Sequence, residues 1–318
     1  MSASKPIEMI SSMETYELNF YIKKIVESLG DVTINLTRVS TSKLVDILCE
    51  DASADKYDLI FGTALTALLD VRLAPKLASH NTTAKDKLDA KFADADGLWF
   101  APSAYSVAVC VDREKLKSRS IDPPTSWSDM CKPEFHGEIV APHPASSGAA
   151  YLQVFSMLQV MGEADGWKML EALNHNVVEY TASGLAPCHA VADGKSALGV
   201  SVAIAIAHTQ AEHANLDMMI PTDKVGCEPE AFALLKKADQ NPVVPQILEW
   251  ALSAEAQDCY RGYSKISLVD QSALQKSAAE GASEAAVPTA VPIDVFKAAS
   301  IKNSIVAEWN RRIGSSLC

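Results

Sequence analysis

The chain has 318 residues, of which 48% are hydrophobic, and its formal charge at pH 7 is −12. This length and apolar content are enough for two hydrophobic cores, so we expect two lobes. The negative charge argues against nucleic acid and anionic membrane surfaces as partners. No apolar run in the sequence reaches the roughly 20 residues of a membrane helix.

The first residues, Met1–Pro6, lack the apolar region of a signal peptide. We therefore expect either a cytosolic protein or the mature part of an exported one. The seven cysteines lie far apart without C-x-x-C spacing, which argues against zinc-ribbon and thioredoxin-type chemistry. Their odd number favours free, mostly buried thiols over a disulfide framework.

The first part of the chain alternates between two kinds of apolar pattern. Strands are predicted at Ile7–Ile10, Val32–Leu36 and Tyr57–Phe61. One helix is predicted up to Leu29, where Gly30 ends it, and another over 40–48. This alternation predicts an α/β fold with a parallel sheet.

Ligands of such sheets bind outside the carboxyl ends of the strands. This rule selects the loops at Ser11–Thr15 and Gly62–Thr63, with Ser11, Ser12, Glu14 and Thr63 as candidate ligand-binding residues. Glu14 could pair with an amine or accept hydrogen bonds from hydroxyls, or it could be a first-turn glutamate that favours the helix dipole. Thr63 could donate to a ligand or cap the following helix.

The chain is organised around the stretch Pro142–Tyr151. A β-like run, Gly137–Ala141, precedes it, and an apolar helix is predicted to follow over Ala149–Met161. The turn before this helix makes Ser146, Ser147, Gly148 and Ala149 candidate ligand-binding residues. Free amides at the positive end of a helix dipole form an anion site. The alternative is that one serine is simply an N-cap.

A predicted strand at 177–180 ends at Ser183–Gly184, and Pro187 opens another helix. Ser183 is a second anion-binding candidate, although it could only stabilise the turn. A buried strand is predicted over Ala197–Ala207. Glu228, which Pro229 separates from Glu230, is a further ligand-binding candidate, with a solvated carboxylate as the alternative.

The C-terminal part reads as a helix at Pro245–Leu252, an irregular connection at Gly281–Pro292 and a docked helix at Asp294–Ile313. Cys188 and His189 suggest an activated nucleophile, but neighbouring helical residues point about 100° apart and do not easily share a proton. His208 and His213 are five residues apart on a predicted helix and do not form a metal pair. We expect no metal site and no cofactor.

Six stretches form a series along the chain. They are Gly97–Trp99, Pro124–Asp129, Lys132–Ile139, Pro144–Gly148, Tyr180–Pro187 and Trp250–Gln257. In this order and spacing they resemble the type II solute-binding proteins of ABC importers. Within these, the chain is most similar to the group that holds ferric-ion, hexose-phosphate and aminoethylphosphonate binders.

The resemblance implies a two-lobed type II periplasmic-binding-protein fold, with two crossover strands and a ligand cleft between the lobes. It implies a discontinuous first lobe, which we place at 1–103 plus 222–318, and a second lobe at 104–221. It also implies a periplasmic or membrane-anchored protein, a monomer that delivers its ligand to ABC permease subunits, and closure about a hinge. An enzyme on the same fold is the alternative of another class.

In ferric binders of this group, a Ser-Gly-Ala turn holds an anion, and Ser147-Gly148-Ala149 resembles it. The adjacent tyrosine pair of ferric binders is absent from this chain, and Val202–Ala205 occupies the corresponding segment. The His-Asp pair of hexose-phosphate binders is also missing there. We therefore expect a small anionic or zwitterionic ligand, such as a phosphonate, a sugar phosphate or a carboxylate. Ferric ion with a synergistic anion is the alternative.

Overall fold

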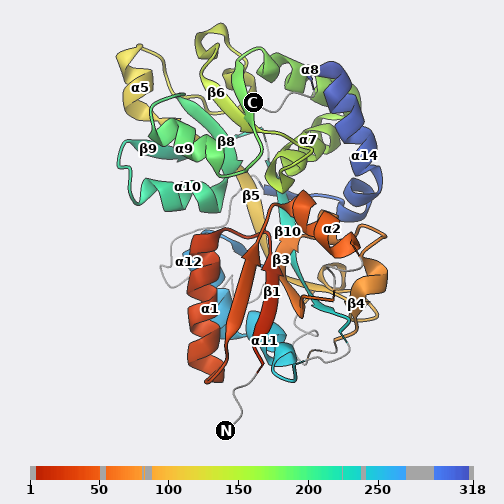
Figure 1. The fold of residues 1–318 in the computed structure, drawn as a ribbon. Helices are drawn as coiled ribbons and strands as arrows, with labels where there is room; N and C mark the ends of the chain where they lie inside the picture. The colour runs from red at the N-terminus through yellow and green to blue at the C-terminus, as the bar shows by residue number, and fades with distance from the viewer. Residues whose placement is uncertain are drawn as a thin grey trace. The chain divides into compact units, whose positions relative to one another are not determined.

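The structure is a computed structural model that describes residues 5–50, 55–80, 82, 88–223, 225–237, 241–269 and 290–314. The chain forms two compact units (Figure 1). Unit 1 comprises Met1–Ala104 and Pro229–Ala285, and unit 2 comprises Tyr105–Glu228 and Ala286–Cys318. Two long strands, β5 (Phe100–Asp112) and β10 (Val225–Leu235), each begin in one unit and end in the other.

Unit 1 contains a sheet with the order β2-β1-β3-β10, in which β1 is parallel to β2 and β3 and β10 is antiparallel to β3. Strand β5 follows β10 in the strand order. Two short strands pair with these two long ones, β4 with β10 and β11 with β5. Its further elements are β1 (Ile7–Ser11), α1 (Thr15–Leu29), β2 (Ile34–Arg38), α2 (Thr41–Cys49), β3 (Leu59–Ala64), α4 (Leu65–Leu68), β4 (Leu77–Ala78), α11 (Val244–Ala251), α12 (Ala254–Gly262) and β11 (Ile266–Ser267). Short 3₁₀ turns lie at Ala74–Lys76 and Ala90–Phe92.

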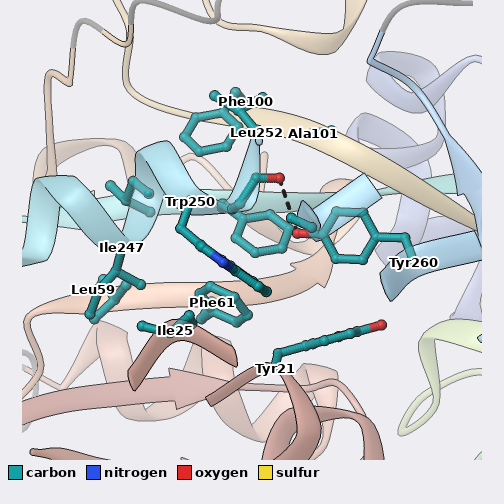
Figure 2. Packing of buried hydrophobic residues seen from close by; sticks show 14 of the residues in the cluster. Tyr21, Ile25, Leu59, Phe61, Phe100, Ala101, Ile247, Trp250, Leu252 and Tyr260 are labelled. Atoms are coloured by element: carbon teal, nitrogen blue, oxygen red, sulfur yellow. Dashed lines mark hydrogen bonds between the residues drawn. The ribbon is translucent and has the colours of Figure 1, made fainter. Parts of the chain in front are cut away.

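Aromatic residues from distant parts of the sequence fill the core of unit 1 (Figure 2). The Tyr21 ring meets the Tyr260 ring edge to face, with centroids 5.4 Å apart, and Phe61 meets Phe232 in the same way at 4.7 Å. The Tyr260 hydroxyl donates to the Ala251 carbonyl at 3.2 Å. Buried aromatics of this kind contribute both area and specific geometry, so α1 and α12 are held against the sheet.

Unit 2 has the sheet order β5-β8-β6-β7, in which β6 is parallel to both of its neighbours and β5 is antiparallel to β8. Strand β9 pairs with β5, and β12 pairs with β10. Its further elements are α5 (Arg113–Ser118), α6 (Trp127–Met130), a 3₁₀ turn (Pro133–Phe135), β6 (Ile139–Pro142), α7 (Gly148–Met161), α8 (Glu163–Asn174), β7 (Val177–Thr181), α9 (Ala186–Ala192), β8 (Leu198–Val202), α10 (Ala203–Gln210), β9 (Leu216–Met219), β12 (Ala290–Pro292) and α14 (Val295–Arg312). None of the described helices is long and apolar enough to cross a membrane.

Two sequence predictions in unit 2 are corrected by the structure. The predicted strand over Ala197–Ala207 is a strand only to Val202, and α10 begins at Ala203. Periodicity could not separate the two because both parts are apolar and buried. His213 lies beyond the end of α10. Most of the predicted irregular connection, Gly281–Pro292, lies outside the described residues.

The terminal helix α14 was predicted to belong to the first lobe, but in the structure it belongs to unit 2. It packs against α7, as Figure 1 shows. The Tyr151 hydroxyl of α7 donates to the Ala298 carbonyl, and Arg312 pairs with Glu171 at 2.7 Å. The Trp309 ring lies 5.5 Å from that of Tyr180. These contacts bury one face of α14 and place this helix with unit 2, instead of in the predicted 222–318 part of the first lobe.

Candidate functional site

The predicted polar loops of unit 1 lie at the carboxyl ends of β1 and β3 and are bonded to each other. The Ser11 hydroxyl donates to the Gly62 carbonyl at 3.0 Å and accepts from the Met13 amide at 3.1 Å. The Ser12 hydroxyl donates to Thr63 Oγ1 at 2.9 Å. Gly62 has a φ of 80°, and a Cβ there would lie 2.1 Å from Met13 Cε. The two loops therefore hold each other in one arrangement.

Thr63 is the first predicted site residue whose surroundings differ from expectation. It lies inside β3, which continues to Ala64, and its side chain is buried. It accepts from Ser12 and does not cap the following helix, because α4 begins at Leu65. Ser11 is also buried. Ser11 and Thr63 thus support the two loops from within unit 1, and the hydrogen bond of Ser12 to Thr63 connects the loops.

Glu14 occupies the N-cap position of α1, where its amide donates to Glu17 Oε1 at 2.9 Å. Its carboxylate pairs with Arg38 Nη2 at 2.8 Å, and Arg38 Nε donates to the Met13 carbonyl at 3.1 Å. Sequence reasoning missed Arg38. A signal was present, because Arg38 follows a predicted strand, and such strand ends are where ligands of α/β sheets bind.

The predicted anion site of unit 2 is the start of α7. Ser147 is its N-cap, and the Ser147 hydroxyl accepts from the Ala150 amide at 3.4 Å. The amides of Ser146 and Ser147 donate to the His143 carbonyl at 3.2 and 3.0 Å. Gly148 and Ala149 are the first two residues of the helix, so their amides have no acceptor within it. The N-cap role of Ser147 therefore does not exclude an anion site, because the amides of Gly148 and Ala149 remain outside the hydrogen bonds of the helix.

The loop after β7 lies directly beside this helix start. A Cβ on Gly184 would come within 3.2 Å of Ser147 Oγ, so a larger residue at this position would require the two segments to shift apart slightly. The Ser183 hydroxyl accepts from the Leu185 amide at 3.2 Å, and the Ser183 carbonyl accepts from the Thr181 hydroxyl at 2.8 Å. Ser183 therefore stabilises the turn, which was one of the two roles predicted for it.

His143 is a buried residue of this turn that sequence reasoning did not select. Its Nδ1 accepts from the Ala145 amide at 3.1 Å, which places the ring hydrogen on Nε2. Burial lowers the pKa of His143 below its ordinary value, so the ring stays neutral. Edge-to-face contacts with Tyr180 and Trp309 fix its orientation, with ring centroids 6.2 and 6.3 Å apart. The local signal was a histidine between two prolines, Pro142 and Pro144.

The alternative prediction for Glu228, a solvated carboxylate, is wrong, and its neighbour Glu230 is not solvated either. Both are buried in β10. The Tyr105 hydroxyl donates to Glu228 at 3.2 Å. Strand β10 continues through Pro229, and the two-residue period of a strand puts both carboxylates on one face.

The Cys188–His189 pair also has a plain structural role. Cys188 is fully buried in an apolar cluster on α9, while His189 is exposed. The two side chains therefore lie in different surroundings and do not form a nucleophile and its base. Among the described residues, no group of three or more His, Cys, Asp or Glu side chains could hold a metal ion.

Two α/β units that share two long strands define a solute-binding protein of the type II class. The chain belongs to the family described as Bacterial extracellular solute-binding protein, which matches its residues 54–289. Its members are binding proteins of transporters and not enzymes. The predicted membership and the predicted absence of catalysis are thereby confirmed.

Two sequence relatives match parts of the chain. An uncharacterized protein of Haemophilus influenzae is 31% identical over 149 residues, which cover 46% of this chain and 43% of that protein. The phosphoglycerate transport regulatory protein PgtC of Salmonella typhimurium is 29% identical over 171 residues, covering 53% of this chain and 41% of that protein. The chain thus spans less than half the length of either relative.

A solved structure matches nearly the whole chain. The periplasmic binding protein AfuA of Actinobacillus pleuropneumoniae, with fructose-6-phosphate bound, has a TM-score of 0.82 and 21% identity. The match covers 98% of this chain and 99% of that one. It confirms the predicted fold class, the two-lobed α/β fold of type II.

Proposed function

We propose that this solute-binding component of an ABC import system binds a small phosphorylated solute, such as a sugar phosphate or a phosphorylated hydroxy acid. The start of α7 is the observation that carries the proposal. This helix has 14 residues, and the positive end of its dipole carries three donors: the amides of Gly148 and Ala149 and the hydroxyl of Ser147. Such a turn binds a phosphate without an arginine, because amide donors and the dipole supply the field.

The names of similar proteins agree with a phosphate group. PgtC is named for phosphoglycerate transport, and the AfuA structure contains fructose-6-phosphate. Both solutes pair one phosphate with a short chain of oxygen-bearing carbons. A phosphonate or a carboxylate would also suit the amides of this turn, so the experiment below compares solutes with and without the phosphate.

Unit 1 offers a complementary set of groups for the rest of the solute. We assign the outer groups of its loops, the Ser12 hydroxyl and the Glu14–Arg38 pair, to the hydroxyls or the carboxylate of the ligand. Arg38 suits a carboxylate such as that of a phosphoglycerate, because a guanidinium binds a carboxylate with two parallel hydrogen bonds. Ser11, Thr63 and Ser183 then support the binding loops, while Glu228 accepts from Tyr105 and joins β10 to β5.

We assign the mechanism to hinge motion in β5 and β10, the two strands that enter both units. A solute that binds the closed form better than the open form shifts the population toward closure. The closed protein then meets the permease subunits of the importer. This mechanism suits a monomer in the periplasm or one anchored to the outer face of the membrane.

The proposal is tested by isothermal titration of the purified protein with 3-phosphoglycerate and fructose-6-phosphate. Glycerate and fructose serve as the matched compounds without phosphate. We expect heat from at least one phosphorylated solute and none from its partner. Equal binding of a solute with and without its phosphate would contradict the proposal.

The variant Ala149→Asp tests whether the phosphate binds at the start of α7. It puts a negative charge at the second position of α7 and should abolish binding while the protein stays folded. Ala254→Asp is the control, because it adds the same charge in the first turn of the serine-capped helix α12. Ala254 is exposed, and acidic residues are favourable in a first turn. If Ala149→Asp still bound the phosphorylated solute at full affinity, the anion would not lie at α7.

A further inference from the structure

A lysine with no solvent exposure lies inside unit 1 between two carboxylates. The ammonium of Lys265 is 2.5 Å from Glu17 Oε2 and 2.6 Å from Glu230 Oε2. Both carboxylates are themselves buried. We call Glu17, Glu230 and Lys265 the buried ion triad. Because two negative charges share one positive charge, the triad holds a net charge of −1 when both carboxylates are ionised.

Burying charges in this way is unfavourable unless every charge finds partners. The fold supplies them: the Tyr21 hydroxyl donates to Glu17 at 3.3 Å, and the Ser103 hydroxyl donates to Glu230 at 2.9 Å. Ser264, which precedes Lys265, has a φ of 58°, a left-handed backbone that is rare for serine. A strained residue persists only where its surroundings hold it in place, so the position of Lys265 is set by several constraints at once.

The triad also reaches the proposed ligand-binding loop of unit 1. One oxygen of Glu17, Oε2, faces Lys265, and the other, Oε1, accepts from the Glu14 amide at 2.9 Å. Glu14 ends the β1–α1 loop (Ser12–Glu14) and carries the ion pair with Arg38. Through Glu230 and Ser103, the same triad is bonded to β10 and β5 close to where these strands leave unit 1.

We propose that the buried ion triad positions the β1–α1 loop, so that proton uptake by Glu17 loosens this loop and weakens solute binding. The inference rests on the proposed function, because it takes this loop to contact the solute. An ionised Glu17 holds the Glu14 amide with a charge-assisted hydrogen bond, which is about twice as strong as a neutral one. A protonated Glu17 keeps the shape of the loop but loses that strength.

Glu17 is poised to exchange its proton near neutral pH. Burial raises its pKa from the ordinary 4.5 to about 7, the charge of Lys265 acts in the opposite direction, and the charge of Glu230 adds to the rise. Three titratable phenols from the elements packed around the triad face it. They belong to Tyr21 of α1, Tyr260 of α12 and Tyr263 at the end of α12. Burial raises the pKa of each of these phenols above its ordinary value of 10, so none of the three phenols exchanges a proton near neutral pH.

The test compares the wild type with Glu17→Gln, which stands for the protonated carboxyl at every pH. Affinity for 3-phosphoglycerate and fructose-6-phosphate is measured between pH 6 and pH 8. The titration of the phosphate itself affects both proteins, so it cancels in the ratio of the two dissociation constants. We expect the wild type to gain roughly five- to tenfold over the variant between pH 6 and pH 8, as for a hydrogen bond that becomes charge-assisted.

Asp58→Asn is the matched control. Asp58 is also a buried carboxylate of unit 1, paired with Lys237 at 2.9 Å, and it accepts from the Glu8 amide at 2.8 Å. That site lies before β3, away from the β1–α1 loop, so its removal should leave the pH dependence as in the wild type. A ratio for Glu17→Gln that is constant with pH, or the same change in Asp58→Asn, would overturn the proposal.

Hydrogen–deuterium exchange without solute separates the two proposals and needs no variant. After correction for intrinsic rates, the peptide over Ser12–Glu17 should become about five- to tenfold better protected from pH 6 to pH 8 in the wild type. Protection that does not change with pH overturns the role of the triad, whether or not a solute binds or Glu17→Gln folds. If protection changes as expected but neither solute binds, the proposed ligand is wrong and the loop contact with these solutes falls with it.

Discussion

The Ser103 hydroxyl donates to the buried carboxylate of Glu230 at 2.9 Å, one residue before β5 leaves unit 1. On the other side of that boundary, in unit 2, the Tyr105 hydroxyl donates to Glu228 at 3.2 Å. The residues are two apart on each strand, so the same faces of β5 and β10 are joined in both units. Buried hydroxyl–carboxylate pairs resist separation because an unpaired buried charge is costly. Each pair therefore holds β5 to β10 within its own unit.

The cap of α7 gives the first prediction. Ser147→Ala removes a hydroxyl from the proposed phosphate site and from the Ala150 amide. We expect roughly tenfold to a hundredfold weaker binding of the phosphorylated solute, together with about 1 kcal/mol of lost stability. Ser253→Ala is the control, because Ser253 caps α12 in the same way at 3.2 Å. It should lose similar stability and no affinity; equal affinity losses in both variants would remove the ligand role of Ser147.

The second prediction concerns the terminal helix. Trp309 is buried against His143 and Tyr180 in unit 2, so Trp309→Ala should cost about 3–5 kcal/mol of unfolding free energy. Phe296→Ala on the same helix should cost little, since 56% of Phe296 is exposed. Urea unfolding followed by circular dichroism measures both. Similar costs in the two variants would mean that α14 does not complete the core of unit 2.

The third prediction is a pH dependence of stability. The pKa of Glu17 is higher in the folded protein, about 7, than its ordinary 4.5. Between these values the folded state binds more protons than the unfolded state. The free energy of unfolding should therefore fall as pH rises from about 5 to 8, by at most roughly 1.4 kcal/mol per pH unit for one proton. Glu17→Gln should flatten this slope in chemical denaturation series, and an unchanged slope would assign it to other groups.

Removing the cation of the triad should be more damaging than removing one carboxylate. The charges of Glu17 and Glu230 raise the pKa of Lys265 against the opposite effect of burial, so the lysine stays charged. Lys265→Met leaves two buried carboxylates without a cation and should cost about 3–5 kcal/mol at pH 8. The loss should shrink at pH 5.5, where a carboxylate can take up a proton. A pH-independent loss would indicate a packing defect instead.

The last prediction addresses ferric iron. The resemblance to ferric binders implies an adjacent tyrosine pair in that group, and the corresponding segment here begins α10 with alanine and isoleucine. Adding ferric citrate to the protein should therefore give no visible phenolate-to-iron charge-transfer band. A band that saturates at one equivalent would replace the phosphorylated solute by ferric ion as the ligand.

The fold was largely predictable because strands and helices alternate with distinct periods. Ile7–Ser11 and Thr15–Leu29 lie within a residue or two of their predicted places. The boundary of α10 was missed because a run of alanine and isoleucine satisfies either period. The unit that receives α14 was also missed, since that choice depends on contacts with Tyr151 and Glu171 that no local pattern encodes.

The candidate site was predictable to the level of loops but not of partners. The turn at Ser147 and the loop at Glu14 follow from strand ends and capping patterns. The partner of Glu14, Arg38, and the burial of Glu228 depend on the register of neighbouring strands. Lys265 gave no signal at all, because a lone lysine in a sequence is normally exposed.

The late position of α14 in the chain has a consequence for biosynthesis. Unit 1 needs residues after 229 for its sheet, and unit 2 needs α14, which ends at Arg312. A growing chain therefore cannot complete the core of unit 2 until residues up to Arg312 have been synthesised. Contacts between residues so distant in sequence slow folding, so neither unit can fold as a consecutive stretch of the chain while it is being made.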